Sequence, residues 1–260
     1  MQIRAAQTEA QSAFDPTATK PESRRMTEHE IVDRAITTRR SVRGFLSTPV
    51  PRTTVEEILA VASRAPSGTN IQPWKVHVLS GAARARFCAA IGAAHDEDYA
   101  RKQRGEAPLH KEEYGYYPVQ WFEPYLGRRR KLGWELYGLL DIGKKDYDKM
   151  HAQHGRNYTF FDAPVGLIFS IDRRMLQGSW LDYGMFIENI MIAARGRGLD
   201  TCPQQAFAHY HTIIESFLGL PATDMVMCGM ALGFEDKSVV ANRLTTERAA
   251  VAEFTTFVET

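Results

Sequence analysis

A nearly unbroken run of apolar residues, APVGLIFSI at positions 163–171, is the feature that most restricts the fold. Such a run predicts a β-strand covered on both faces, because a strand with one solvated face alternates apolar and polar residues. WKVHVLS, from Trp74 to Ser80, does alternate and predicts a half-buried strand. MVMCGMALGF near the C-terminus predicts a further buried strand. We expect these strands to form the core of one sheet.

Helical periodicity marks three other segments. One begins near Glu28, and a second, TTVEEILAVASRA, has capping-box spacing between Thr53 and Glu56. A third has Ser179 and Asp182 as its predicted cap and is apolar over most of its circumference, which predicts central burial. Because helices and strands are interspersed without strict alternation, the sequence favours an α+β fold.

The predicted organisation is a flexible arm at residues 1–26, which are polar and lack a sustained period, followed by one domain at 27–260. Within that domain, residues from about 95 to 158 are crowded with aromatic and charged side chains and carry little strand signal. We interpret this stretch as an inserted helical lid.

Charge and cysteine content exclude several classes of protein. Lys and Arg number 32 against 31 Asp and Glu, so no overall field attracts nucleic acid or a membrane surface. The three cysteines are far apart and form no CxxC pair, which argues against a disulfide scaffold and a zinc ribbon. No apolar stretch is long enough to span a bilayer, and the first residues lack the apolar block of a signal peptide. We therefore expect a cytoplasmic protein.

The first candidate site is the cluster RRSVR, in which Arg39, Arg40, Ser41 and Arg43 fall within five positions at the end of a predicted helix. Guanidinium groups match phosphate oxygens in two-point contacts, and a serine adds a hydroxyl donor. The cluster therefore indicates a phosphate site. A solvated basic turn is the alternative.

The second candidate is the loop APSGTNIQPW, between a predicted helix and a strand. Ser67, Asn70 and Gln72 can satisfy the donors and acceptors of a ring edge or a ribityl chain. Gly68, two positions after Pro66, lets the backbone come close to a planar ligand. Taken alone, the loop favours the alternative, a plain turn.

Together the two segments make the sequence resemble the nitroreductase family of FMN enzymes, from about Glu28 to the C-terminus. The apolar helix, the following GLDTCPQQAF and the arginine of TTERAAVAEF occur in the family's order. The resemblance implies an α+β, nitroreductase-like fold with a central mixed β-sheet surrounded by helices. It also implies an intertwined homodimer with shared active sites.

The resemblance assigns roles to individual positions. Arg39, Arg40, Ser41 and Arg43 would hold the FMN phosphate and one face of the flavin, while Arg248 would close the phosphate site. Pro66, Ser67, Gly68 and Asn70 would reach the cofactor of the partner subunit. Backbone N–H groups around Pro203, Gln204 and Gln205 would lie near flavin N5 and O4, although many family members have an acidic residue and a glycine where this chain has the two glutamines.

The lid resembles that of reductases acting on nitroaromatics such as nitrobenzoate. Its stacking candidates for a small aromatic substrate are Tyr114, Tyr116, Trp121, Phe122 and Tyr125. The alternative is that these rings pack the insertion onto the core or the dimer. The basic run at 128–131 could meet a substrate carboxylate or form a solvated helix face.

Other chemistry finds less support. Neither the pair His151 and His154 nor the pair His209 and His211 comes with a recognisable ligand motif, so we expect no metal. The sequence lacks a dinucleotide-binding GxGxxG, a phosphate-binding P-loop and a hydrolase elbow. Cys202 lacks a resolving partner nearby and is interpreted as a small buried hydrophobe.

The resulting functional prediction is an FMN nitroreductase with a ping-pong cycle, in which NADPH or NADH reduces the flavin and a nitroaromatic then takes hydride from N5. No side chain need act as an obligatory general acid, so the flavin itself carries the chemistry. One alternative keeps the fold but changes the acceptor, as in reductive dehalogenation, enone reduction or flavin fragmentation. Another is a flavin-binding module without catalysis.

Overall fold

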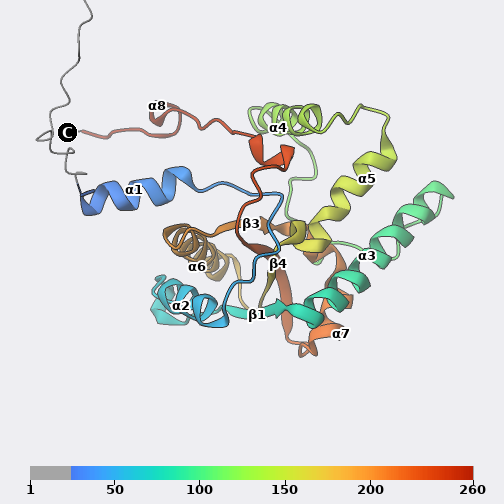
Figure 1. Ribbon diagram of the computed structural model, residues 1–260, viewed down its shortest axis with the longest axis horizontal. Coiled ribbons are helices and arrows are strands. Elements are labelled where there is room, and N and C mark those ends of the chain that lie inside the picture. Colours follow the sequence, from blue (N-terminus) through green and yellow to red (C-terminus); the bar gives the residue numbers. More distant parts are fainter. Residues whose placement is uncertain (1–24, 260) are drawn as a thin grey trace, which may run out of the picture.

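The structure, a computed structural model, describes residues 25–259, so the arm expected at residues 1–26 lies almost wholly outside it. Its centre is one sheet of four strands in the order β1-β2-β4-β3 (Figure 1). The strands are β1 Lys75–Ser80, β2 Val165–Asp172, β3 Asp200–Gln204 and β4 Asp224–Gly233. The strands expected at positions 74–80 and 163–171 and in MVMCGMALGF are therefore confirmed.

All three strand pairings are antiparallel, and a register shift interrupts the β2–β4 ladder between Phe169 and Ser170. A mixed sheet was expected. Among the described residues, the one parallel pairing is an isolated bridge between Ser41 and Thr201 of β3. β2 is buried along its length up to Ile171, as its unbroken apolar sequence predicts.

Two hydrophobic clusters cover the two faces of the sheet. On one face, α2 (Arg52–Ala62) and α6 (Gln177–Gly196) pack on alternate β2 residues such as Leu167 and Phe169. On the other face, α3 (Gly81–Gln103), α7 (His211–Leu218) and the 3-10 turns η2 (Arg156–Asp162) and η3 (Gln205–Tyr210) surround Ile168. Figure 1 shows α2 and α6 on one side of the strands, and α3 and α7 on the other.

Two expected helix starts are wrong. α2 begins at Arg52 after Pro51, and Glu56 pairs with Arg52 at 2.7 Å, so Thr53 is inside the helix and forms no capping box. A proline fixes its φ and suits the start of a helix, which moves the boundary ahead of the threonine. α6 likewise begins two residues before Ser179, with no side-chain cap.

α6 is buried on one side only, which corrects the expected central burial. Tyr183, Phe186 and Ile190 lie in the core, whereas Leu181 is 74% exposed and Met185 is 41% exposed. The apolar circumference of this helix therefore serves both the core and an outer surface.

The stretch from 95 to 158 contains the end of α3, then α4 (Tyr125–Leu139) and α5 (Tyr147–Gly155). The structure places no strand in this stretch. No helix among residues 25–259 is long and apolar enough to cross a membrane.

Two segments project from the body of the molecule. α1 (Glu28–Thr38) has no buried residue, and its Ile31, Val32 and Ile36 are each about half exposed. The C-terminal segment continues from the 3-10 turn η4 (Val240–Arg243) through the short α8 (Val251–Phe254) and extends in the same direction as α1 (Figure 1). The chain therefore leaves apolar side chains uncovered at its projecting segments.

Close packing between β4 and η3 generates a stability prediction. A Cβ added at the buried Gly229 would overlap the ring of Phe207, which is fully buried. We expect Gly229→Ala to lower the free energy of unfolding by about 1–3 kcal/mol, measured by urea denaturation. The control is Gly92→Ala in α3, where nothing lies within 4 Å of the new Cβ; helix propensity predicts a gain of about 1 kcal/mol there. Equal stabilities for the two variants would contradict the packing.

Candidate functional site

The arginine-rich segment leaves α1 after Thr38 and runs extended beside the edge strand β3. Val42 N–H donates to Thr201 O at 3.0 Å, and the Val42 side chain is fully buried. Ser41 and Arg43, on either side of Val42, are half-buried. One buried valine thus anchors the segment and leaves its polar neighbours near the surface.

The arginines of this segment have different partners. Arg40 pairs with Glu235 and also donates to the backbone carbonyl of Asn242. Within the described chain, the one ion pair of Arg39 is a longer contact, 3.5 Å, with Glu188. The charge of Arg40 is therefore neutralised within the chain, while Arg39 is weakly paired. Because a guanidinium carries five N–H donors, Arg40 can still serve a phosphate with those that remain.

Arg43 is the least engaged of the three. Its guanidinium donates to Ser41 O at 3.2 Å, and among residues 25–259 no carboxylate forms an ion pair with it. Its backbone N–H donates to Asn242 Oδ1 at 2.6 Å, which fixes where the side chain starts. Arg43 therefore retains an unneutralised charge at a fixed position, as an anion site requires.

Asn242 is a structural residue that the sequence analysis did not identify. Its Nδ2 group donates to the backbone carbonyls of Gly44 and Asp236, and its Oδ1 holds the arginine segment. The side chain is buried. No local pattern could reveal it, because its partner segment lies about 200 positions away in sequence.

The second candidate loop has a constrained backbone. Its 3-10 turn is η1 (Gly68–Asn70), and Asn70 and Gln72 have positive φ values of 59° and 49°. Such conformations are uncommon for residues other than glycine and persist where neighbours hold them. Ser67 Oγ accepts from Gln72 N–H at 3.0 Å, and Asp182 Oδ2 accepts from Gly68 N–H at 3.0 Å. Asp182, expected as a helix cap, instead ties this loop to α6.

The same loop faces outward. Pro66, Gly68, Asn70 and Gln72 are exposed, and Ser67 is half-buried. A Cβ at Gly68 would meet only an Asp182 carboxylate oxygen, at 3.8 Å. No hydrogen bond among the described residues joins the loop to the arginine segment. Its polar groups are therefore available to a ligand or subunit outside this chain.

The expected loop around residues 203–205 is a strand end. Pro203 and Gln204 belong to β3, and Gln205 opens η3. Pro203 is exposed and has no amide proton, so only the two glutamines can donate backbone N–H groups. Gln204 is buried: its Nε2 donates to Asn157 O at 2.7 Å, and its Oε1 has no partner.

Tyr114 is a packing residue in this chain. Its hydroxyl donates to Met227 O at 2.6 Å and lies 3.0 Å from Gln205 Oε1. Its ring meets Trp180 edge-on with centroids 4.9 Å apart, and burial raises the pKa of the phenol. The side chain predicted to stack on substrate thus connects β4, α6 and η3.

The remaining lid aromatics lie near the surface. Tyr116, Phe122 and Tyr125 are each about half exposed. Phe122 and Tyr125 meet edge-on, with ring centroids 5.1 Å apart. Trp121 is half-buried beneath the guanidinium of Arg129, 4.8 Å from the ring centroid. Among the described residues, no hydrogen bond, ion pair or ring contact joins these side chains to the arginine segment.

The basic run of α4 forms ion pairs with the C-terminal segment. Lys131 pairs with Glu247 at 2.6 Å, and Arg128 lies 3.9 Å from Glu253. Arg248 is exposed and donates only to groups of the two preceding residues. Within the described chain, Arg248 is therefore not part of the arginine segment, and its predicted role in the phosphate site stays a prediction.

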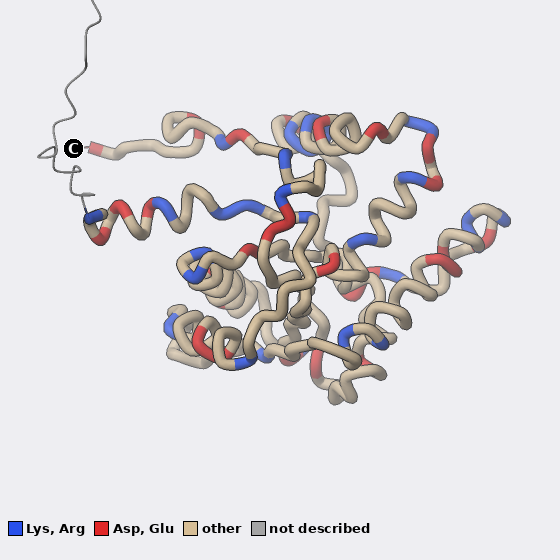
Figure 2. The backbone as a smooth tube through the Cα atoms, viewed as in Figure 1, with Lys and Arg blue, Asp and Glu red and all other residues tan. Residues whose placement is uncertain are grey.

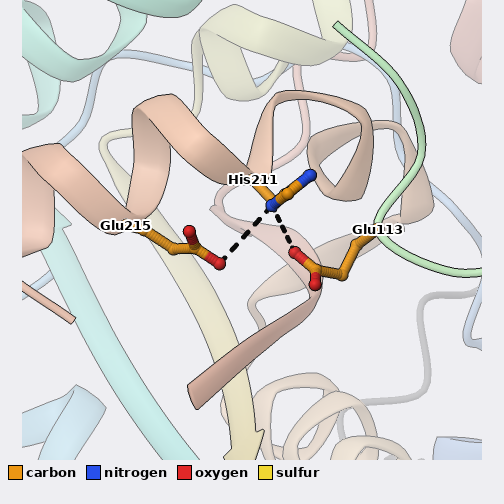
Figure 3. Close-up of side chains that lie close together, drawn as sticks. All are labelled: Glu113, His211 and Glu215. Atoms are coloured by element: carbon orange, nitrogen blue, oxygen red, sulfur yellow. Dashed lines mark hydrogen bonds and ion pairs between the residues drawn. The ribbon is translucent and has the colours of Figure 1, made fainter. Parts of the chain in front are cut away.

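A second cluster of ionisable groups surrounds His211 (Figure 3). Glu113 and Glu215, the second on the same helix as His211, place carboxylate oxygens near its Nδ1, and ligand atoms of the three residues lie within 4.8 Å of one another. Arg173 pairs with both carboxylates. Because the guanidinium already supplies the positive charge, we interpret the cluster as an ion-pair network.

Cys202 is buried, as expected for a small hydrophobe. Only 3% of the residue is exposed, and burial raises the pKa of its thiol to about 11. The three cysteines are all free. A thiol with so high a pKa stays protonated at neutral pH and is a poor nucleophile.

Comparison with known proteins identifies the class to which this fold and site belong. The model of the nitroreductase family matches residues 36–234, which include the arginine segment, the second loop and the whole sheet. The chain therefore belongs to the nitroreductase family, which confirms the resemblance seen in the sequence.

Individual relatives are similar over nearly their whole length. The chain is 42% identical to the chloronitrobenzene nitroreductase of Comamonas testosteroni, over 87% of this chain and 96% of that protein. It is 40% identical to the 4-nitrobenzoate reductase of Pseudomonas putida, over 87% and 95%. A solved structure of the FMN and NADPH-dependent nitroreductase NfnB from sphigopyxis sp. strain HMH superposes with a TM-score of 0.80 at 32% identity, covering 88% of this chain and 99% of that one.

Proposed function

We propose that this chain is an FMN-dependent oxidoreductase that uses NADPH or NADH to reduce nitroaromatic compounds. The similarity to two nitroaromatic reductases, over nearly their whole length, supports this substrate class. The observation that carries the proposal in this chain is the guanidinium of Arg43, which starts from a fixed position beside β3 and has no ion pair with a carboxylate among residues 25–259. That position suits a ligand that carries a phosphate.

The residues present fit FMN. Arg39 and Arg43 keep donors for the phosphate, and the half-buried Ser41 lies between them. The backbone amides of Gln204 and Gln205 follow at the end of the strand that anchors this segment. In the proposed arrangement, the arginines bind the phosphate and the amides face the ring.

When bound, FMN would supply the hydride-transfer chemistry between the reduced nicotinamide and the nitro compound. The chain contributes position and electrostatics. The amides of Gln204 and Gln205 would stabilise negative charge on the reduced ring system, and Arg39 and Arg43 would balance the phosphate charge. Protons can come from solvent, so no side chain needs to act as an obligatory acid.

The proposal includes a homodimer with shared active sites. Apolar side chains project from α1 and from the outer side of α6, where Leu181 is 74% exposed. Phe254 and Phe257 of the C-terminal segment are 69% and 78% exposed. A second copy would remove this surface from water, which favours association by about 25 cal/mol per Å². The outward-facing loop with Asn70 would then contact the partner's cofactor.

We also propose that residues 27–260 form one FMN-binding domain, in which residues from about 95 to 158 form a lid over the substrate. We further propose a cytoplasmic location. Aromatic side chains such as Trp121 and Tyr125 give the lid surfaces for a ring. Three free thiols suit a reducing compartment. Acidic and basic residues are interspersed over the described part of the chain (Figure 2), and a formal net charge of +1 disfavours nucleic acid as a partner.

An anaerobic visible spectrum of the purified protein tests this proposal. We expect a yellow protein that bleaches when NADPH or NADH is added and regains its colour with 4-nitrobenzoate. Bleaching without reoxidation by the nitro compound would keep the cofactor and move the acceptor to another class, such as an enone or a halogenated phenol. A yellow protein that never turns over any acceptor would indicate a binding module, and one that fails to take up FMN would overturn the proposal.

Arg43→Ala tests the phosphate site. Loss of one charge-assisted contact is worth about 1.5–3 kcal/mol, so we expect FMN to bind at least about tenfold more weakly. The measurement is flavin fluorescence on dilution of the holoprotein. The control is Arg174→Ala, which removes an exposed guanidinium that pairs only with Asp172. Full flavin occupancy in Arg43→Ala would contradict the assignment.

The dimer is tested with Ile36→Glu in α1. Burying an unpaired carboxylate at an apolar interface is costly, so we expect light scattering after size exclusion to show a shift toward the 29.4 kDa monomer. Shared sites also predict a loss of bound FMN from that monomer. Val61→Glu, at a half-exposed position of α2, is the control. A wild-type chain that is already monomeric would refute the homodimer.

A further inference from the structure

A cavity of about 320 Å³ lies between α3, α5 and η3, outside the residues proposed to hold FMN. Four of its lining residues, His95, Asp98, Tyr99 and Lys102, recur at helical spacing on one face of α3. The cavity therefore has one wall built by a single helix face.

The buried carboxylate of Asp98 is the unusual group in this wall. The residue is 8% exposed, and its Oδ1 accepts from Leu109 N–H at 2.7 Å. Its Oδ2 has no hydrogen-bond partner. Among the described residues, the one basic side chain within 4 Å is His209, whose Nε2 lies 3.8 Å from Oδ2, too far for a hydrogen bond. A buried carboxylate oxygen without a donor is costly, and a ligand that brings a donor relieves that cost.

The charges around the cavity favour a cation. Asp98 and Glu112 supply two carboxylates against the single ammonium of Lys102. Burial lowers the pKa of His95, His154 and His209, so their rings are neutral at pH 7 and do not offset the carboxylates. The fourth imidazole of the lining, His151, faces the carboxylate of Asp96 at 2.8 Å, outside the cavity lining. The lining is left with a net negative charge.

Aromatic rings form the rest of the cavity. His151 of α5 stacks on His95 with centroids 4.1 Å apart and on Tyr99 at 4.0 Å. Tyr158 lies 4.9 Å from His95. Because this stacking covers both faces of His151, the rings act as apolar walls, and the buried carboxylate of Asp98 beside them supplies the partner for an ammonium group.

A metal ion fits less well. Among residues 25–259, the only group of three possible ligands with atoms within 4.8 Å of one another is the cluster around His211. No three of the imidazoles and carboxylates that line this cavity meet that condition. An organic cation can span that space.

We propose that the cavity binds a small organic cation, a protonated amine whose ammonium group pairs with Asp98 and whose body packs against the rings of Tyr99, His151 and Tyr158. His209, which is 32% exposed, covers Oδ2 without bonding to it and would move aside to admit the ammonium group.

Isothermal titration of the full-length, flavin-saturated protein with benzylamine at pH 7 tests the proposal. We expect saturable binding to the wild type and much weaker binding of benzyl alcohol, which has the same shape and no charge. Asp98→Asn keeps the acceptor for Leu109 N–H and should weaken benzylamine binding about tenfold or more. Glu97→Gln, which removes a carboxylate of the same helix that does not line the cavity, should leave binding within about twofold.

The variant Lys102→Gln should change the affinity for benzylamine in the opposite direction to Asp98→Asn. Lys102 is exposed, so the fold does not depend on it. Removing its charge should tighten benzylamine binding by about two- to threefold. The proposal is overturned if benzylamine does not bind the wild type, if Asp98→Asn binds it as tightly as the wild type, or if benzyl alcohol binds equally well. Binding that Asp98→Asn leaves intact would place benzylamine at the aromatic substrate site instead.

Discussion

Burial of β2 on both faces is the constraint on which the rest of the structure depends. A strand with apolar side chains on each side needs two separate layers, and the chain provides α2 and α6 for one and α3, α7 and two 3-10 turns for the other. This arrangement leaves β1 and β3 at the edges of the sheet. Edge strands keep unpaired backbone groups, which other segments can use.

The candidate site follows from that free edge. At β3 the arginine segment contributes a parallel bridge at Ser41 and a hydrogen bond at Val42, so its polar side chains start from fixed positions. Asn242 then holds the same segment from the opposite end of the sequence. Backbone pairing and the buried side-chain amide of Asn242 therefore fix where the donor side chains begin, although those side chains are long and flexible.

Much of the fold could be predicted because its signals are local. Periodicity within a few residues identifies β1, β2, β4, α1, α2 and α6. The arginine segment that begins at Arg39 and the loop that contains Asn70 together indicate the family. β3 was missed because Asp200–Gln204 is short, contains a proline and has no apolar run. The role of Asp182 was wrong, and the hydrogen bonds of Tyr114 were missed, for another reason: their partners Gly68, Gln205 and Met227 lie about 90 or more positions away.

Neighbouring arginines that look alike in sequence have different electrostatic states in the fold. Arg40 meets Glu235, which β4 carries just beyond its end, whereas Arg43 meets no carboxylate among the described residues. The difference follows from the extended backbone, which sends side chains of successive residues to opposite sides. A basic cluster therefore divides into a part that stabilises the chain and a part that remains free for a ligand. Only the tertiary positions of the acidic residues determine which arginine belongs to which part.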